Sequence, residues 1–246
     1  MTRRSRSGNR QLRGGDLTRT PEERNELKVI YVVAEGEGTE YDYLNRVDRV
    51  YGRRLGFRIQ TPNPATQRNG LHPRRVVEEA VQIVAELNID QVWGLFDHDG
   101  RSDVPQVCAE ARRRGVNVAL SHPAFELWLL LHFPNRIPAA QDGRNKSLID
   151  NLRRADLAFA DYAHRDKRID DRRFLALYAE DGIADAVKQS RALVDRCPSG
   201  CGCSARSGHA SSCEPDKRDP STDVYLLIQS LGIVPCPSEG CPHGPS

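Results

Sequence analysis

The sequence lacks any long apolar run. No stretch approaches the ~20 consecutive apolar residues that a helix needs to cross a membrane, and the Arg-rich N-terminus lacks the apolar core of a signal peptide. We therefore expect a cytoplasmic protein without membrane contact. The sequence also has no internal repeat and no Gly-x4-Gly-Lys-Ser/Thr loop, which excludes a P-loop for nucleotide phosphates.

Cysteine is nearly absent from the first 196 residues, where only Cys108 occurs, whereas the other six of the seven follow. In a cytosolic chain such a cluster predicts metal binding before disulfides. The candidate zinc ligands are Cys197, Cys201, Cys203, His209, Cys213, Cys236, Cys241 and His243. Neighbouring glycines allow the tight loops that a tetrahedral zinc site needs, but no pair has the Cys-x2-Cys spacing. Disulfides or a disordered tail remain the alternatives to a structural zinc site.

The charge of the chain is uneven. Its 246 residues carry a net charge of +2, yet residues 1–24 hold seven Arg against three acidic residues. Such a basic, Gly/Ser/Arg-rich start is typical of a disordered, solvated tail. It is also suited to contacts with nucleic-acid phosphates. The composition of the whole chain, 38% hydrophobic and 28% charged, is that of an ordinary globular protein.

Apolar runs and helix-period segments alternate through the first half of the chain. Strands are expected at residues 28–34, 57–60, 91–96 and 116–120, and helices start near residues 39, 73, 104 and 123. This β-α alternation predicts an α/β fold with an open, mostly parallel sheet and helices on both faces. Further helices are expected at 145–156, 171–177, 182–195 and 224–231.

Carboxylates follow two of the expected strands. Glu35 closes the first strand, Glu40 starts the next helix, and Asp97 and Asp99 close the third strand. Ligands of parallel sheets bind at the carboxyl ends of the strands, and clustered carboxylates usually need a bound cation. The pattern predicts a Mg²⁺ or Mn²⁺ site formed by Glu35, Asp97 and Asp99. The alternative is that the aspartates merely cap a helix while Glu35 is solvated.

A strand ending in Glu-Gly and another ending in Asp-x-Asp resemble the Toprim core of topoisomerases, primases and OLD-type nucleases. More specifically, four segments are similar to RloB-like proteins: Glu35-Gly36-x-x-Thr39-Glu40, Phe96-Asp97-x-Asp99, the run from Ser121 to Phe133 (SHPAFELWLLLHF), and the run from Asp219 to Tyr225 (DPSTDVY). The matching segments span about residues 24–232. The resemblance implies a Toprim-like domain over 25–196, completed by a C-terminal helix at 219–232. Residues 197–218 would then be a Cys-rich insertion and 233–246 a Cys/His tail.

The same resemblance implies a nuclease component of antiphage defence. The family is regarded as Toprim-like. Its genes are found beside restriction-modification and abortive-infection genes, often with an ABC-type ATPase as partner. Two carboxylate-bridged cations about 4 Å apart would both stabilise phosphoryl charge and generate a nucleophile. From the resemblance, an ABC- or AAA-type ATPase is the expected protein partner, and RNA (including tRNA) or DNA is the expected substrate.

Three further residues are candidates for the catalytic site. Glu126 begins the apolar helix after the fourth strand and is placed to join the carboxylates or to favour the helix dipole. His132, on the same expected helix, is either catalytic or packed in the core. Among Lys146, Lys167 and Lys188, Lys188 is preferred for transition-state stabilisation because its helix is expected to turn it inward.

Three functions are compatible with the sequence. The first is a metal-dependent nuclease. The second is a non-catalytic nucleic-acid-binding or adaptor subunit of an ATPase-containing defence complex. The third is a phosphatase acting on small phosphates, which the Arg-rich tail disfavours weakly because it suits a polymeric substrate.

Overall fold

The centre of the molecule is a five-stranded sheet with strand order β2-β1-β3-β4-β5. Its strands are β1 (Lys28–Ala34), β2 (Phe57–Gln60), β3 (Gln91–Asp97), β4 (Asn117–His122) and β5 (Ser221–Thr222). All neighbouring pairs are parallel except β4 and β5, which are antiparallel. The structure is a computed structural model that describes residues 27–36, 38–62, 71–87, 89–136, 145–163, 166–196 and 218–235.

The two central strands are apolar because helices cover both faces of the sheet. In β3, the five residues from Val92 to Phe96 are all buried, which is the continuous pattern of a strand inside a parallel sheet. The edge strand β2 instead alternates buried and exposed side chains. The helices are α1 (Thr39–Val47), α2 (Arg53–Leu55), α3 (Pro73–Glu86), α4 (Val104–Arg113), α5 (Glu126–Leu130), α6 (Asn145–Ala155), α7 (Asp171–Tyr178), α8 (Gly182–Arg196) and α9 (Val224–Ser230).

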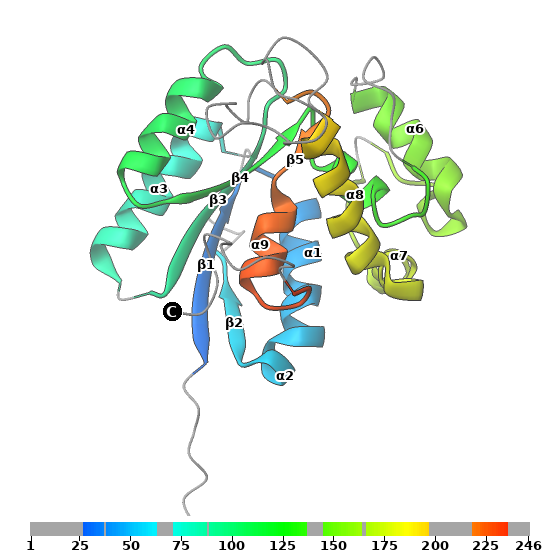
Figure 1. Cartoon of the computed structure of the whole chain (residues 1–246), viewed down its shortest axis with the longest axis horizontal. Helices are drawn as coiled ribbons and strands as arrows, with labels where there is room; N and C mark the ends of the chain where they lie inside the picture. The colour runs from blue at the N-terminus through cyan, green and yellow to red at the C-terminus, as the bar shows by residue number, and fades with distance from the viewer. Residues whose placement is uncertain are drawn as a thin grey trace, which may run out of the picture.

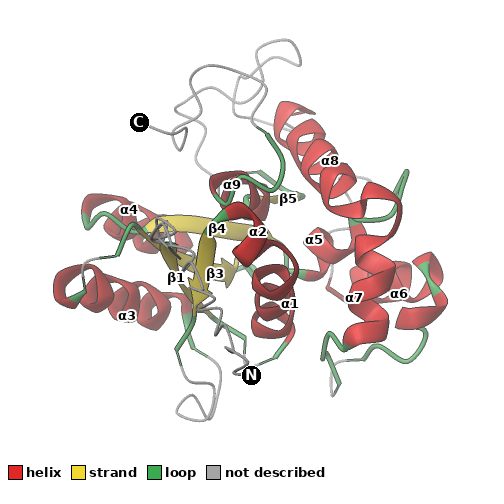
Figure 2. Ribbon diagram, turned by 90° about the horizontal axis from the view of Figure 1, so that it is seen from below, coloured by secondary structure: helices red, strands yellow, loops and turns green. Residues whose placement is uncertain are grey.

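Helices α3 and α4 pack on one face of the sheet, whereas α1 and α5 to α9 lie on the other side (Figures 1 and 2). Alternate residues of the central strands face the two layers. Val33 and Phe96, for example, contact the layer of α3 and α4, while Val32 and Leu95 contact the opposite layer. The sheet is therefore the middle layer of three, as the β-α alternation predicts.

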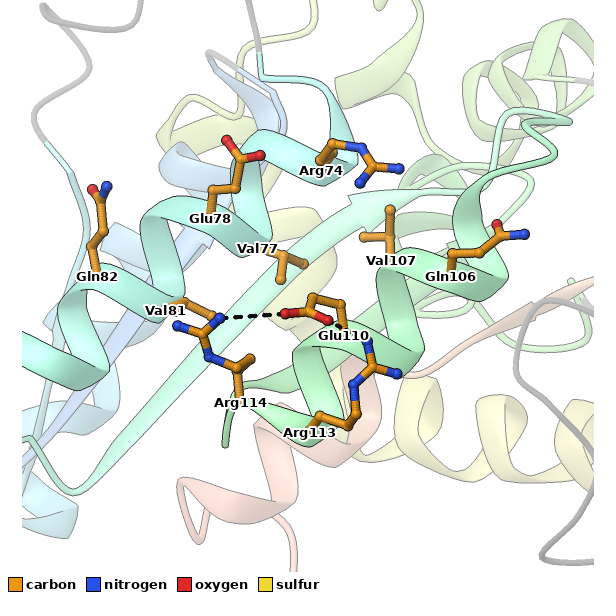
Figure 3. A pocket seen from close by; sticks show the side chains of 10 residues that line it. All are labelled: Arg74, Val77, Glu78, Val81, Gln82, Gln106, Val107, Glu110, Arg113 and Arg114. Atoms are coloured by element: carbon orange, nitrogen blue, oxygen red, sulfur yellow. Dashed lines mark hydrogen bonds and ion pairs between the residues drawn. The ribbon is translucent and has the colours of Figure 1, made fainter.

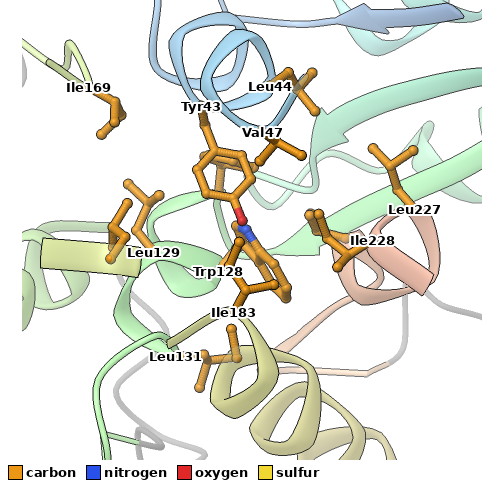
Figure 4. Packing of buried hydrophobic residues seen from close by; sticks show 14 of the residues in the cluster. Tyr43, Leu44, Val47, Trp128, Leu129, Leu131, Ile169, Ile183, Leu227 and Ile228 are labelled. Atoms are coloured by element: carbon orange, nitrogen blue, oxygen red, sulfur yellow. The ribbon is translucent and has the colours of Figure 1, made fainter. Parts of the chain in front are cut away.

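The larger core lies between the sheet and the second group of helices. Tyr43 and Trp128 are fully buried at its centre, with their rings edge to face at 6.3 Å between centroids (Figure 4). Every residue of α5 is buried. The apolar run after β4 is thus a helix enclosed by α6, α8 and the sheet, rather than a surface helix with one apolar stripe.

The predicted α/β sheet with flanking helices is confirmed, and several boundaries differ. The helix expected at 123–133 is only α5, Glu126–Leu130, so that His132 lies beyond its end. Strand β4 ends at His122 rather than at residue 120, and it pairs with β5, which is too short to leave a periodic signal. The N-terminal tail and all eight candidate zinc ligands lie outside the described residues, so the zinc site stays a prediction.

Candidate functional site

Glu35 and Asp97 lie side by side because β1 and β3 are neighbours in parallel register. Ala34 pairs with Leu95, and the Glu35 N–H donates to the Leu95 carbonyl at 2.9 Å. One carboxylate oxygen of Glu35, Oε2, accepts the N–H of Asp97 at 2.9 Å. The two residues thus occupy the carboxyl edge of the sheet, where ligands of open α/β sheets bind.

The chain turns directly after β3, as two carboxylates at alternate positions require. Asp99 and Gly100 both have positive φ values, 47° and 69°. The turn is attached to β4 and the residue after it, since the His98 N–H donates to the Ser121 carbonyl and the Asp99 N–H to the Pro123 carbonyl. Asp99 itself is exposed at the rim.

Glu40 reaches the same edge from the first turn of α1. Its side chain is buried and lies against Gly36, where an added Cβ would come 2.1 Å from Glu40 Oε2. Any larger residue at position 36 would therefore displace this carboxyl group. The Glu-Gly pair at the end of β1 consequently has a structural reason, namely that Gly36 leaves room for Glu40.

The converging carboxylates perturb one another. Burial, followed by the charges of Glu40, Glu126 and Glu35, raises the pKa of Asp97 well above its ordinary value. Burial, together with the charges of Glu126 and Glu35, raises the pKa of Glu40 to about 7, against the opposing effect of Lys167. The pKa of Glu35 is raised in the same way, by burial first, although the Asp97 N–H and Arg101 act against it. Four carboxyl groups from three segments are therefore close enough to interact at this edge.

Lys167 supplies positive charge to this cluster. Its Nζ lies 2.7 Å from Glu126 Oε1, and the same oxygen accepts the hydroxyl of the buried Tyr162 at 3.2 Å. Burial works to lower the pKa of Lys167, but the charge and hydrogen bond of Glu126, with the charges of Asp97 and Glu40, raise it overall. Lys167 is therefore held protonated beside the carboxylates.

The first turn of α1 fixes the segment that carries Lys167. The Thr39 hydroxyl donates to the Lys167 carbonyl. The Asp42 carboxylate accepts two bonds from the Arg168 guanidinium, at 2.6 and 2.8 Å, and one from the Ile169 N–H at 3.0 Å. Such a bidentate pair sets geometry as well as attraction. Thr39 and Asp42 thus position Lys167, while Glu40 between them joins the carboxylates.

The carboxylate set suits a hard divalent cation by its chemistry. Every converging acidic group offers oxygen ligands, which Mg²⁺ and Mn²⁺ prefer, and a cation would relieve the repulsion that raises the pKa values. Within the described residues, no three His, Cys, Asp or Glu side chains are already arranged as a set of metal ligands. Glu35 in particular is engaged by Arg101, whose guanidinium lies 3.2 Å from Oε1. Ligation would therefore require Glu35 to exchange Arg101 for the cation.

Two histidines border the cluster. The rings of His98 and His122 stack with centroids 3.9 Å apart and planes inclined by 8°. His122 Nε2 lies 3.8 Å from the carboxylate of Asp219. The stack sits at the Asp97–Asp99 turn, so the Asp219 segment near the C-terminus is brought to the same edge through β5.

Glu126 joins the predicted site residues, whereas His132 and Lys188 do not. His132 is buried between Tyr43, whose hydroxyl is 3.1 Å from Nε2, and the Trp128 carbonyl, 2.9 Å from Nδ1. Burial lowers its pKa to about 4. The expected inward orientation of Lys188 is wrong, because this residue of α8 is exposed.

Sequence reasoning missed Lys167 as the cluster's lysine, and it missed Arg101 and Tyr162 altogether. Their partners lie 41, 66 and 36 residues away in the sequence, for Lys167–Glu126, Arg101–Glu35 and Tyr162–Glu126 respectively. No local periodicity marks such pairs. The one usable signal is Thr39, which stands in the motif and whose hydroxyl binds the segment that carries Lys167.

These observations define an α/β protein with an acidic, lysine-containing site at the carboxyl edge of a mostly parallel sheet. The chain matches the family described as RloB-like protein over residues 30–231, and it belongs to that family. Comparisons with curated proteins and with solved structures found no match. No helix that the structure describes has the length and apolar character needed to cross a membrane.

Proposed function

We propose that this RloB-like protein is a divalent-metal-dependent nuclease that hydrolyses phosphodiester bonds at the carboxyl edge of its sheet. The observation that carries the proposal is the convergence of Glu35, Glu40, Asp97 and Glu126. Burial, followed by the repulsion of neighbouring carboxylates, raises the pKa values of Glu35, Glu40 and Asp97, and the charge of Glu126 adds to the shifts of Glu40 and Asp97. Perturbed acidic groups at the ligand-binding edge of a sheet are typical of functional sites.

Glu35, Asp97 and Asp99 are the residues that would hold Mg²⁺ or Mn²⁺, with Glu40 and Glu126 behind them. When bound, the cation supplies charge stabilisation at phosphoryl oxygens and lowers the pKa of a coordinated water. Glu40 and Glu126 are buried, so they act in a medium of low dielectric constant, where each charge interaction is stronger than in water.

Lys167 and Arg101 have a separate role in this proposal. Both are cations beside the carboxylates, with Lys167 fixed through Thr39 and Arg101 bound to Glu35. A phosphodiester that enters the site brings negative charge, and these two side chains are placed to receive it. Their attachment to the scaffold means that little reorganisation is needed when charge develops on the phosphoryl group.

The test is cleavage of RNA and DNA oligonucleotides with Mg²⁺ or Mn²⁺, with and without an ABC- or AAA-type ATPase, which we propose as the protein partner. Asp97→Asn with Asp99→Asn is expected to abolish cleavage and to weaken Mn²⁺ binding measured by electron paramagnetic resonance. Glu86→Gln changes an exposed carboxylate at the far end of α3 and is the matched control. Unchanged cleavage in the double variant would remove this site from the reaction.

A second function, a non-catalytic adaptor that binds nucleic acid, has one observation in its favour. Arg101 and Lys167 already neutralise part of the acidic cluster, and no ready set of metal ligands is found in the described residues. In that case the wild-type protein would bind nucleic acid but neither bind Mn²⁺ at the carboxylates nor cleave. Retention of defence by the Asp97/Asp99 variant, with loss only when ATPase binding is lost, would favour the adaptor.

A further inference from the structure

A groove of about 490 Å³ runs between α3 and α4, on the face of the sheet opposite the larger core (Figure 3). Val77, Val81 and Val107 contribute its apolar lining. The polar lining consists of Arg74, Glu78, Gln82, Gln106, Glu110, Arg113 and Arg114. Between Arg74 and Gln82 the helix rises about 12 Å, at roughly 1.5 Å per residue.

One end of this groove adjoins the acidic site. Leu71, just before α3, donates its N–H to the Glu35 carbonyl at 2.8 Å. Arg101, the partner of Glu35, lies three residues before α4. His72 Nε2 is 3.9 Å from Asp103 Oδ2, which connects the starts of the two helices. Both helices therefore begin at the carboxyl edge, where their N-terminal dipole ends favour an anion.

The side chains along the groove leave positive charge available. Within the part of the chain that the structure describes, the Arg74 guanidinium has no ion-pair partner. Arg113 and Arg114 both pair with one carboxylate, that of Glu110. Glu78 is paired with Arg75, which lies outside the groove lining, at 2.8 Å. Two guanidinium charges are thus uncompensated by acidic groups of the groove, one near each end.

We infer that this groove binds the sugar–phosphate backbone of the nucleic-acid strand whose scissile phosphate occupies the acidic site. The inference rests on the proposed function and extends it by assigning the path of the substrate. A length of about 12 Å corresponds to three or four phosphates along the axis of one strand, at roughly 3.4 Å per phosphate. Arginine forks bind phosphate oxygens in bidentate fashion.

The continuity with the site selects nucleic acid over an acidic protein segment. A strand that leaves the carboxyl edge over the starts of α3 and α4 meets Arg74 first and the Arg113–Arg114 pair last. An acidic peptide would use the same guanidinium groups, but nothing in its binding requires α3 to begin beside Glu35, whose carbonyl accepts the Leu71 N–H. The Gln82 and Gln106 amides add hydrogen-bonding groups without opposing charge.

The experiment measures binding of a fluorescent 20-nucleotide RNA or DNA to the full-length protein in EDTA, across a salt series, so that no cleavage is required. The association constant K falls with salt, and the steepness of log K against log salt is expected to decrease by about one unit in Arg74→Gln. It is expected to decrease by a similar amount in Arg113→Gln. Glu110→Gln removes the competing carboxylate, and it is expected to tighten binding and to steepen the slope. The control is Lys188→Gln, which changes an exposed lysine of α8 and is expected to leave the slope unchanged.

Oligonucleotide binding that weakens in the arginine variants and tightens in the Glu110 variant would separate a charge effect from misfolding, because misfolding only weakens binding. Unchanged slopes in both arginine variants, or no oligonucleotide binding by the wild type, would overturn the inference. Arginine variants that bind poly-glutamate more weakly than the wild type, but bind the oligonucleotide equally well, would also overturn the inference and would assign the groove to a protein partner. Failure of the nuclease proposal is recognised separately, because the wild type would then show the expected slopes without cleaving in Mg²⁺ or Mn²⁺.

Discussion

Replacing Glu40 by Gln is expected to stabilise the metal-free protein at pH 8. Glu40 is buried, and its pKa is raised from 4.5 to about 7 by burial and by the charges of Glu126 and Glu35. Because the folded pKa lies above the unfolded value, the contribution of this group to stability is complete below about pH 4.5. It is lost as the pH rises through about 7.

The magnitude follows from the size of the pKa shift. A shift of two to three units, at about 1.4 kcal/mol per unit, corresponds to roughly 3 kcal/mol of destabilisation once Glu40 is ionised. Gln keeps the shape and polarity of the side chain without its charge. The variant should therefore gain up to about 3 kcal/mol at pH 8 and little at pH 4.5, where Glu40 is protonated in the folded protein and about half protonated in the unfolded chain.

The assay is urea denaturation in EDTA at pH 4.5 and pH 8, with the m value checked for constancy. Glu86→Gln, an exposed carboxylate on α3, is the control and should change stability by no more than about 0.5 kcal/mol. A Glu40→Gln protein that is no more stable than the wild type at pH 8, with an unchanged m value, would refute the electrostatic account. Mn²⁺ should stabilise the wild type by about 2.7 kcal/mol at one hundred times its Kd, and the variant less at the same concentration.

Substitutions at three other positions test neighbouring parts of the site. Gly36→Ala should displace the carboxyl group that lies against it, lowering the thermal midpoint by an amount equivalent to about 1–3 kcal/mol. Lys167→Met leaves the buried Glu126 without its cation and should cost about 2 kcal/mol at pH 8 after allowance for the partial exposure of the lysine, as read from urea denaturation. His122→Phe should preserve the ring stack and the slow amide exchange of His98, whereas His122→Ala should accelerate that exchange. Equal exchange rates in the two His122 variants would show that the stack does not hold the turn.

The central sheet and its acidic edge were predictable because their signals are local. The apolar runs of β1 and β3 stop at Glu35 and Asp97, and both strands are buried on two faces. Parallel neighbours bring their carboxyl ends together, so the meeting of these residues followed once the strands were recognised. Gly100 with positive φ likewise follows from the need to turn directly after Asp97.

The cationic half of the site was not predictable in the same way. Lys167 lies in an irregular segment between α6 and α7, where no periodicity indicates which side chains face the sheet. Lys188 lies in a regular helix, yet its predicted inward orientation was wrong, because the face that a helix buries depends on the elements it packs against. A lysine's partner is set by tertiary packing, since a charged side chain has no sequence period of its own.

The first turn of α1 connects the two halves of the site. Thr39 and Asp42 are three residues apart and therefore share one side of the helix, where they bind the segment from Lys167 to Ile169. Glu40, between them, points toward the carboxylates instead. A single helical turn thus sets both the repulsion in the cluster and the cation that offsets it. A divalent cation in the proposed site would offset the same repulsion as the lysine, so we expect the affinity for the cation to depend on how firmly this turn holds Lys167 in place.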